Sequence, residues 1–242
     1  MTAPLLEMTS VLKTYGGLRP LRVDRLVMGA GDRVALLGLD AAAAEVFVNL
    51  LTGASLPEQG RVALFGTDTA SINDPDEWLA LLERLGIVSA RAVLLDDLTV
   101  AQNIAMAYTL SIEPVSGDVM ADVRRLAAEA GIEPDWLDRR VAEAPAHVRP
   151  RCHLAKALAL NPSLLVLEHA NAFAPDDAPA LAQVIAGVAR ARGLAMLVIC
   201  ADEAFARAAA GRVLAVSAAT GELKERSGWR RFLARDSPGP SR

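Results

Sequence analysis

The most constraining feature of this sequence is a short apolar strand that stops at a glycine and is followed at once by a helical stretch. A turn at Gly31 and Asp32 leads into the apolar run 34–37, which ends at Gly38. The residues from there to Gly53 have the apolar spacing of a buried helix. The stretch therefore predicts a strand, a loop and a buried helix in direct succession.

A loop in this position can bind a phosphate group when three kinds of residue are present. Glycines let backbone N–H groups wrap the phosphate, a lysine reaches its outer oxygens, and a hydroxyl binds magnesium. This chain keeps Gly38, but it has Ala41 and Ala43 at the later glycine positions, Ala44 at the lysine position and Glu45 at the hydroxyl position. The frame of a nucleotide site is present without the side chains that would hold the nucleotide.

Residues 41–44 are open to two interpretations. Alanine is a strong helix former, so Asp40 can cap a helix that starts where the loop would be. The alternative is a retained, weak phosphate cradle. We favour the capped helix, because Glu45 would place a carboxylate in the first turn of a helix whose N-terminus otherwise favours a phosphate.

The rest of the chain alternates between strand-like and helix-like segments. Strands are expected at residues 5–14, 21–28, 61–65, 87–89, 164–167, 195–200 and 212–216. Helices are expected at residues 76–85 with Asp74 as the cap, from 98, at 117–130, from 136, at 151–160 and at 179–192. Strands that alternate with helices predict an α/β fold with a parallel sheet.

Composition and charge exclude several classes of protein. The chain has 242 residues, of which 52% are hydrophobic, and a net charge of −4, so it is not a disordered polyanion and has no overall attraction to nucleic acid. The longest uncharged apolar run near the centre of the chain, residues 194–201, is far shorter than the roughly 20 residues of a membrane helix. We therefore expect a cytoplasmic protein.

No metal-binding pattern is found among the cysteines and histidines. Cys152 and Cys200 lie far apart without a partner motif, so we expect small buried side chains rather than a disulfide or metal ligands. His147 and His153 are separated by a proline and do not form a credible metal pair. We expect no metal site.

In their order and spacing, several segments resemble the nucleotide-binding domain of ATP-binding cassette (ABC) transporters. The resemblance runs from about residue 5 to residue 228. It rests on Tyr15 before the first turn, the strand and loop 34–38, Pro-Glu-Gln-Gly-Arg-Val at 57–62, Leu-Thr-Val-Ala-Gln-Asn-Ile at 98–104, Ala-Lys-Ala-Leu-Ala-Leu-Asn-Pro at 155–162, and the apolar run 164–167.

The resemblance implies an α/β fold, a P-loop NTPase-like three-layer domain with a mostly parallel sheet. This domain would span residues 1–228, with an antiparallel β subdomain at its N-terminus and a helical insertion at about 90–160, and residues 229–242 would be a partly disordered tail. It also implies a transmembrane permease and a second cassette subunit as partners, and a position at the inner face of the cell membrane. A short helix of the permease would dock near Val93, Leu94 and Leu95.

The positions that carry function in the family are altered here. Ala90 replaces a glutamine that contacts magnesium and the attacking water, and residues 144–148 (Ala-Pro-Ala-His-Val) replace the Leu-Ser-Gly-Gly-Gln signature. Glu168 stands for the magnesium-binding aspartate and His169 for the glutamate that polarises water. Ala201 replaces the switch histidine and is followed by a family-like Asp202.

We therefore predict a degenerate cassette subunit that does not hydrolyse ATP and acts as a docking or regulatory subunit, with weak or absent binding of ATP and magnesium. The alternative is a weakly ATP-binding or active subunit within a dimer, with Tyr15 as an adenine platform rather than a turn aromatic. His169 could act as a base, although a hydrogen-bonded structural role is commoner, and Glu168 could hold a magnesium ion with few other partners. A kinase or GTPase would need an intact lysine loop, which the chain lacks.

Overall fold

A six-stranded sheet forms the centre of the molecule. The computed structural model describes residues 3–226. The strands follow the spatial order β10-β9-β3-β8-β7-β6. Their bounds are β3 (Arg33–Leu37), β6 (Leu85–Ser89), β7 (Leu164–Glu168), β8 (Ala195–Ile199), β9 (Arg212–Val216) and β10 (Leu223–Glu225). All neighbours are parallel except β10, which runs antiparallel to β9, and this confirms the predicted mostly parallel sheet.

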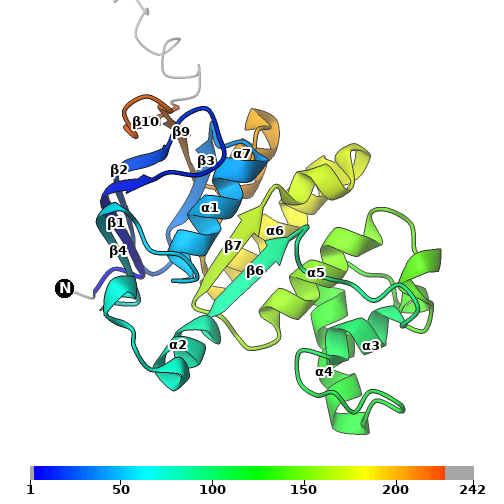
Figure 1. Cartoon of the computed structure of the whole chain (residues 1–242). Coiled ribbons are helices and arrows are strands. Elements are labelled where there is room, and N and C mark those ends of the chain that lie inside the picture. Colours follow the sequence, from blue (N-terminus) through cyan, green and yellow to red (C-terminus); the bar gives the residue numbers. More distant parts are fainter. Residues whose placement is uncertain (1–2, 227–242) are drawn as a thin grey trace, which may run out of the picture.

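The first part of the chain forms a second, antiparallel sheet, as predicted. It has the order β2-β1-β4-β5 and consists of β1 (Leu6–Lys13), β2 (Leu21–Met28), β4 (Gln59–Leu64) and β5 (Thr67–Asp68). It stands beside helix α1 (Ala41–Leu51) on the left of Figure 1. This sheet and α1 share one hydrophobic core on one face of the central sheet.

The three middle strands of the central sheet, β3, β8 and β7, are largely apolar because each of them contributes to two cores. In β3, Val34 and Leu36 belong to the core shared with α1, whereas Ala35 and Leu37 belong to the core on the opposite face. β7 and β8 alternate in the same way. Successive side chains of a strand point to opposite faces, so a sheet covered on both sides requires uninterrupted apolar runs.

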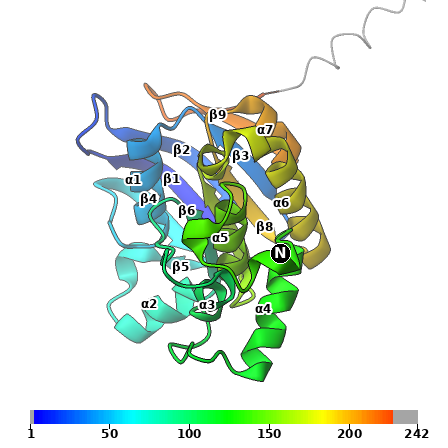
Figure 2. The same ribbon diagram turned by 90° about the vertical axis from the view of Figure 1, so that its right-hand side faces the viewer.

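Helices cover the second face. These are α5 (Val148–Leu158), α6 (Ala178–Arg192) and α7 (Glu203–Ala209). α3 (Val100–Ala105) and α4 (Gly117–Glu129) pack on α5 and project to the right in Figure 1. α2 (Pro75–Leu82) lies apart from them, at the lower left of the figure. Figure 2, turned by 90°, shows α5 and α6 in front of the sheet. The segment 100–158 is thus mostly helical, as the resemblance implies.

Several predicted boundaries are wrong. β6 already begins at Leu85, so the preceding helix ends earlier than residue 85, and α5 starts at Val148 because Pro150 is tolerated in a first turn. The helix expected from Trp136 is a single 3-10 turn, Pro134–Trp136. The predicted tail 229–242 lies outside the described residues. In residues 3–226, no helix combines the length and apolarity needed to cross a membrane.

Candidate functional site

The functional positions predicted from the sequence meet at one edge of the central sheet. They follow four strands: Gly38 after β3, Ala90 after β6, Glu168 and His169 at the end of β7, and Ala201 shortly after β8. The strand ends are hydrogen bonded to each other, because His169 N donates to Ile199 O (2.8 Å) and Cys200 N donates to Leu36 O (3.2 Å). The carboxyl ends of parallel strands are where ligands bind in open α/β sheets.

A capped helix, α1, begins at the position where a phosphate-binding loop would lie. The Asp40 side chain accepts a hydrogen bond from Ala43 N (2.8 Å) and its carbonyl accepts one from Ala44 N (2.8 Å), so α1 begins directly at Ala41. This confirms the capped-helix interpretation. Ala44, at the lysine position, is 0% exposed. No positively charged side chain on α1 therefore faces the loop.

Arg91 is a central residue of the site that the sequence analysis missed. Its guanidinium donates to the Glu168 carboxylate from Nη2 (2.9 Å) and Nε (3.3 Å), and to Asn49 Oδ1 from Nη1 (3.2 Å). Nη1 also lies 3.6 Å from Glu45 Oε1. One arginine thus ties together helix α1, the end of β7 and the segment after β6.

The contact with Glu168 dominates this cluster. The Glu168 side chain is only 8% exposed, whereas those of Arg91 and Glu45 are 39% and 50% exposed. Charge pairs in water contribute little, but a buried carboxylate is costly unless a cation neutralises it. Glu45 and Glu168 occupy two positions that bind magnesium in the family that the sequence resembles. The Arg91 guanidinium therefore lies between the two carboxylates at these positions.

Arg91 escaped attention because its position is not a functional one in that family. The adjacent Ala90 was singled out instead, and it is exposed without a polar side chain. The available signal was electrostatic: Glu45 and Glu168 are both acidic at the predicted site, and Arg91 is the first basic residue after β6.

His169 lacks the partners that a general base requires. It adopts a left-handed backbone conformation (φ 48°) and is half-buried. Within the described residues, its Nε2 is buried and has no hydrogen-bond partner. The expected hydrogen-bonded structural role is therefore not seen either. A catalytic histidine is normally oriented by a second polar group, which His169 does not have at Nε2.

Asp202 has a structural role that explains its presence. Its carboxylate accepts hydrogen bonds from Ala204 N (2.7 Å) and Phe205 N (3.1 Å), which caps helix α7. The preceding Ala201 is exposed and carries no group that could contact a phosphate. The segment after β8 therefore leads into α7, and Asp202 acts there as its N-cap.

The segment at the signature position, residues 144–148, bends into the start of α5. His147 makes no side-chain capping bond there, and its Nε2 lies 4.0 Å from Glu133 Oε2. His153 is buried and stacks on Phe173, and burial lowers the pKa of His153 to about 4. In residues 3–226 we find no group of three or more potential metal-binding side chains.

Both cysteines are buried free thiols, as predicted. Burial raises the pKa of Cys152 to about 12 and that of Cys200 to about 11. A reactive cysteine needs a lowered pKa and access to solvent. These thiols are therefore packing residues.

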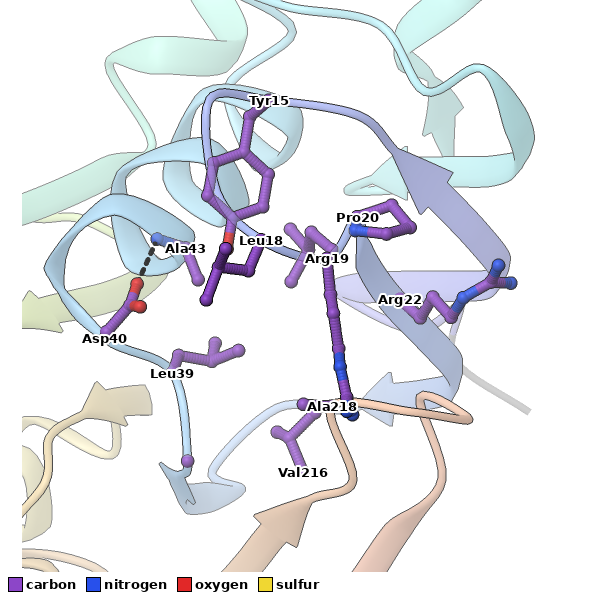
Figure 3. Close-up of a pocket in the computed structure, with 12 residues that line it drawn as sticks. Tyr15, Leu18, Arg19, Pro20, Arg22, Leu39, Asp40, Ala43, Val216 and Ala218 are labelled. Carbon is purple, nitrogen blue, oxygen red and sulfur yellow. Dashed lines mark hydrogen bonds between the residues drawn. The ribbon is translucent and has the colours of Figure 1, made fainter.

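A cavity of about 310 Å³ lies beside the start of α1. Tyr15, Arg19 and Pro20 line it from the β1–β2 turn, and Gly38 and Asp40 line it from the end of β3 (Figure 3). The Tyr15 pKa is raised by burial and by the nearby Asp40 carboxylate. The cavity adjoins the start of α1, where Ala44 and Glu45 lie and where Arg91 approaches Glu45.

The segment expected to dock on a permease follows Arg91 directly, and we call residues 91–98 the docking segment. The side chains of Val93 and Leu95 are 68% and 42% exposed, whereas Leu94 packs against the larger core. Fully buried Asn103 accepts a hydrogen bond from Leu95 N (2.8 Å) and donates one to Leu95 O (2.9 Å). Of the three predicted docking residues, only Val93 and Leu95 face the solvent.

Comparison with known proteins agrees with this architecture. The chain is 29% identical over 221 residues to the methionine import ATP-binding protein MetN of Caulobacter vibrioides, covering 88% of this chain and 64% of MetN. It is 27% identical to the lipoprotein-releasing system ATP-binding protein LolD of Alcanivorax borkumensis, covering 85% of this chain and 91% of LolD. No family model matches the chain.

The dimeric structure of MJ0796, a bacterial ABC transporter cassette, has the same fold. It superposes with a TM-score of 0.74 at 18% identity and covers 93% of this chain and 100% of MJ0796. This chain thus has the fold of an ATP-binding cassette, and its sequence is similar to those of ATP-binding subunits of ABC transporters. It spans less than two thirds of the length of MetN.

Proposed function

We propose that this chain is a cassette subunit that docks on a permease and on a second cassette without hydrolysing ATP. The observation that supports this most directly is the Arg91 cluster, in which a guanidinium neutralises Glu168 and approaches Glu45. Ala44 at the lysine position supports it further. The positive charge of Arg91 lies at the position where an active cassette would bind the metal ion of its nucleotide.

The expected loss of rate is large. Phosphoryl transfer depends on positioning and electrostatic stabilisation, so the loss of one well-placed group removes roughly 10²- to 10³-fold in rate. Such losses do not simply multiply. With no lysine, no hydroxyl ligand and no polarising carboxylate, little acceleration over solution is left.

The proposed docking role draws on the relatives. MetN is an import ATP-binding protein and MJ0796 is a dimeric cassette. We carry over from them only a permease and a second cassette as partners, which would hold this chain at the inner face of the membrane. The exposed Val93 and Leu95 are the residues that we assign to the permease contact.

The purified protein is expected to release no phosphate from ATP above a blank. The measurement is steady-state phosphate release with magnesium present, and the control is an intact cassette of the same family. A turnover that disappears in Glu168→Ala or His169→Ala would contradict the proposal, because those residues would then carry the reaction.

A second candidate is weak nucleotide binding without hydrolysis, and the Tyr15 cavity favours it. A ligand at 100 times its Kd stabilises the folded protein by about 2.7 kcal/mol. The leading proposal predicts no thermal shift in millimolar Mg-ATP. A shift of several degrees that is lost in Tyr15→Ala would support the second candidate instead.

A further inference from the structure

The docking segment is fixed at three points by the protein itself. At its start, Arg91 binds the buried Glu168 carboxylate. Further along, Lys156 Nζ donates to Val93 O (3.3 Å) and Asn103 forms the two hydrogen bonds with Leu95. The polypeptide from residue 91 to residue 95 is thus anchored to β7, α5 and α3 in turn.

The geometry points to Arg91 as a built-in cation that takes the place of a metal ion and nucleotide and holds the docking segment in position without either. This inference rests on the proposed docking role of the segment. Arg91 is a positioning residue here, since it acts on Val93 and Leu95 through the backbone that it anchors. Arg91 thus links the carboxyl end of β7, at Glu168, to the docking segment without a ligand that could dissociate.

The chemistry of the guanidinium suits this task. Its planar fork presents several N–H donors at once, so two of its nitrogens donate to Glu168 Oε2 while a third donates to the Asn49 amide oxygen. An ion or nucleotide binds and leaves according to its concentration, whereas Arg91 is part of the docking segment. The order of the segment therefore cannot vary with the supply of ATP or magnesium.

The matched control is Arg125, which also contacts two carboxylates, those of Asp122 (2.6 Å) and Glu129 (3.1 Å). All three of these side chains lie on α4 and are substantially exposed. Arg125→Ala thus removes an arginine with two acidic partners without touching the docking segment.

The test is amide hydrogen exchange of residues 91–98 in the full chain. Arg91→Ala is expected to speed exchange there by at least about tenfold, because loss of the anchor lets the segment open locally. Arg91→Lys should restore part of the protection, and Arg125→Ala should leave it unchanged. Millimolar guanidinium, but not sodium at the same ionic strength, should slow exchange in Arg91→Ala. Mg-ATP should not change the rates of the unmodified protein.

Unchanged exchange of residues 91–98 in Arg91→Ala would overturn the inference, and so would protection of the unmodified segment by Mg-ATP. If Arg91→Ala does not fold, Glu168→Gln removes the same ion pair while keeping the side-chain shape, and faster exchange of residues 91–98 is expected in it as well. Phosphate release tests the proposed function separately. Measurable hydrolysis together with Arg91-dependent, ATP-independent exchange would refute the proposed function and leave the positioning role standing.

Discussion

Gly38 lies in a left-handed backbone conformation (φ 97°) at the point where the chain leaves β3 and passes the end of β9. A Cβ atom at this position would lie 2.9 Å from Val216 O. The glycine therefore has a steric reason to be present that does not involve a phosphate.

We expect Gly38→Ala to lower the free energy of unfolding by about 1–3 kcal/mol, because it combines a strained φ with a backbone clash. Gly187→Ala is the matched control, since it lies within α6 and a Cβ there would meet no atom within 4 Å. The control should be stabilised by about 0.5–1 kcal/mol. Urea unfolding measures both. Equal stability of the Gly38→Ala protein and the parent would show that the steric argument is wrong.

His153 gives the stability a pH dependence that can be assigned to one side chain. Its pKa is about 4 in the folded protein because it is buried, and an unfolded histidine has a pKa of about 6.5. Between these two values the unfolded chain binds a proton that the folded chain does not bind. The stability contributed by neutral His153 is therefore complete above pH 6.5 and is lost as the pH falls towards 4.

The loss is expected to approach about 3 kcal/mol when the pH reaches the folded pKa. Urea unfolding at several pH values, compared between the parent and His153→Leu, isolates this contribution from that of the carboxylates. The difference in unfolding free energy between the two proteins should change across this pH window. Parallel pH profiles would rule out His153 as the cause.

At the scale of elements, the docking segment and α3 form one unit. The Thr99 side chain accepts from Gln102 N (3.1 Å) and the Gln102 side chain accepts from Thr99 N (2.9 Å), which is a capping box at the start of α3. Asn103, one residue later, holds Leu95. The pattern at 98–104 that resembles the ABC family is thus explained by the local folding of this element.

Val93→Glu is expected to abolish co-purification with a permease and to leave the melting temperature nearly unchanged, because Val93 is exposed. Leu94→Glu is the comparison variant. It should lower the melting temperature, since Leu94 packs against the larger core. Full recovery of the permease with Val93→Glu, or melting of that variant, would remove Val93 from the proposed contact.

The sequence predicted well those elements whose pattern is set by burial alone. β7 and β8 are short apolar runs between turn signals, and Asp40 followed by alanines predicted the capped start of α1 correctly. Helix α7 was missed because it is short and its cap, Asp202, was interpreted as a family position. The Arg91 cluster was missed because its members lie far apart in sequence, with Arg91 and Glu168 separated by 77 positions, so that only their opposite charges pointed to a contact.

At the scale of the whole molecule, the two cores share the strands that lie between them. Leu197 faces the core with α1, and the next residue of β8, Val198, faces the core with α5 and α6. If either core opens, it exposes one face of strands whose opposite face forms the other core. We therefore expect both cores to unfold in one cooperative transition.

Trp78 and Trp136 report on opposite ends of the molecule, because Trp78 binds Thr52 O (2.8 Å) near α1 and Trp136 packs against the helical insertion. In variants that retain one of these tryptophans as the only one, fluorescence and circular dichroism should give the same urea midpoint. Leu197→Ala should shift all of these curves together, by about 2–5 kcal/mol of unfolding free energy. Midpoints that separate would show that the cores unfold independently.

The alternation of side chains between the two cores has a consequence for how such a protein can evolve. Side chains within the strands build both cores, whereas the residues that would bind nucleotide lie just beyond the strand ends, at Gly38, Ala90 and His169. Apart from Gly38, where a Cβ atom would clash with Val216 O, replacements at these strand ends scarcely affect the packing. A lineage can therefore lose its chemistry one residue at a time, with a folded protein at every step on which selection for another task can act.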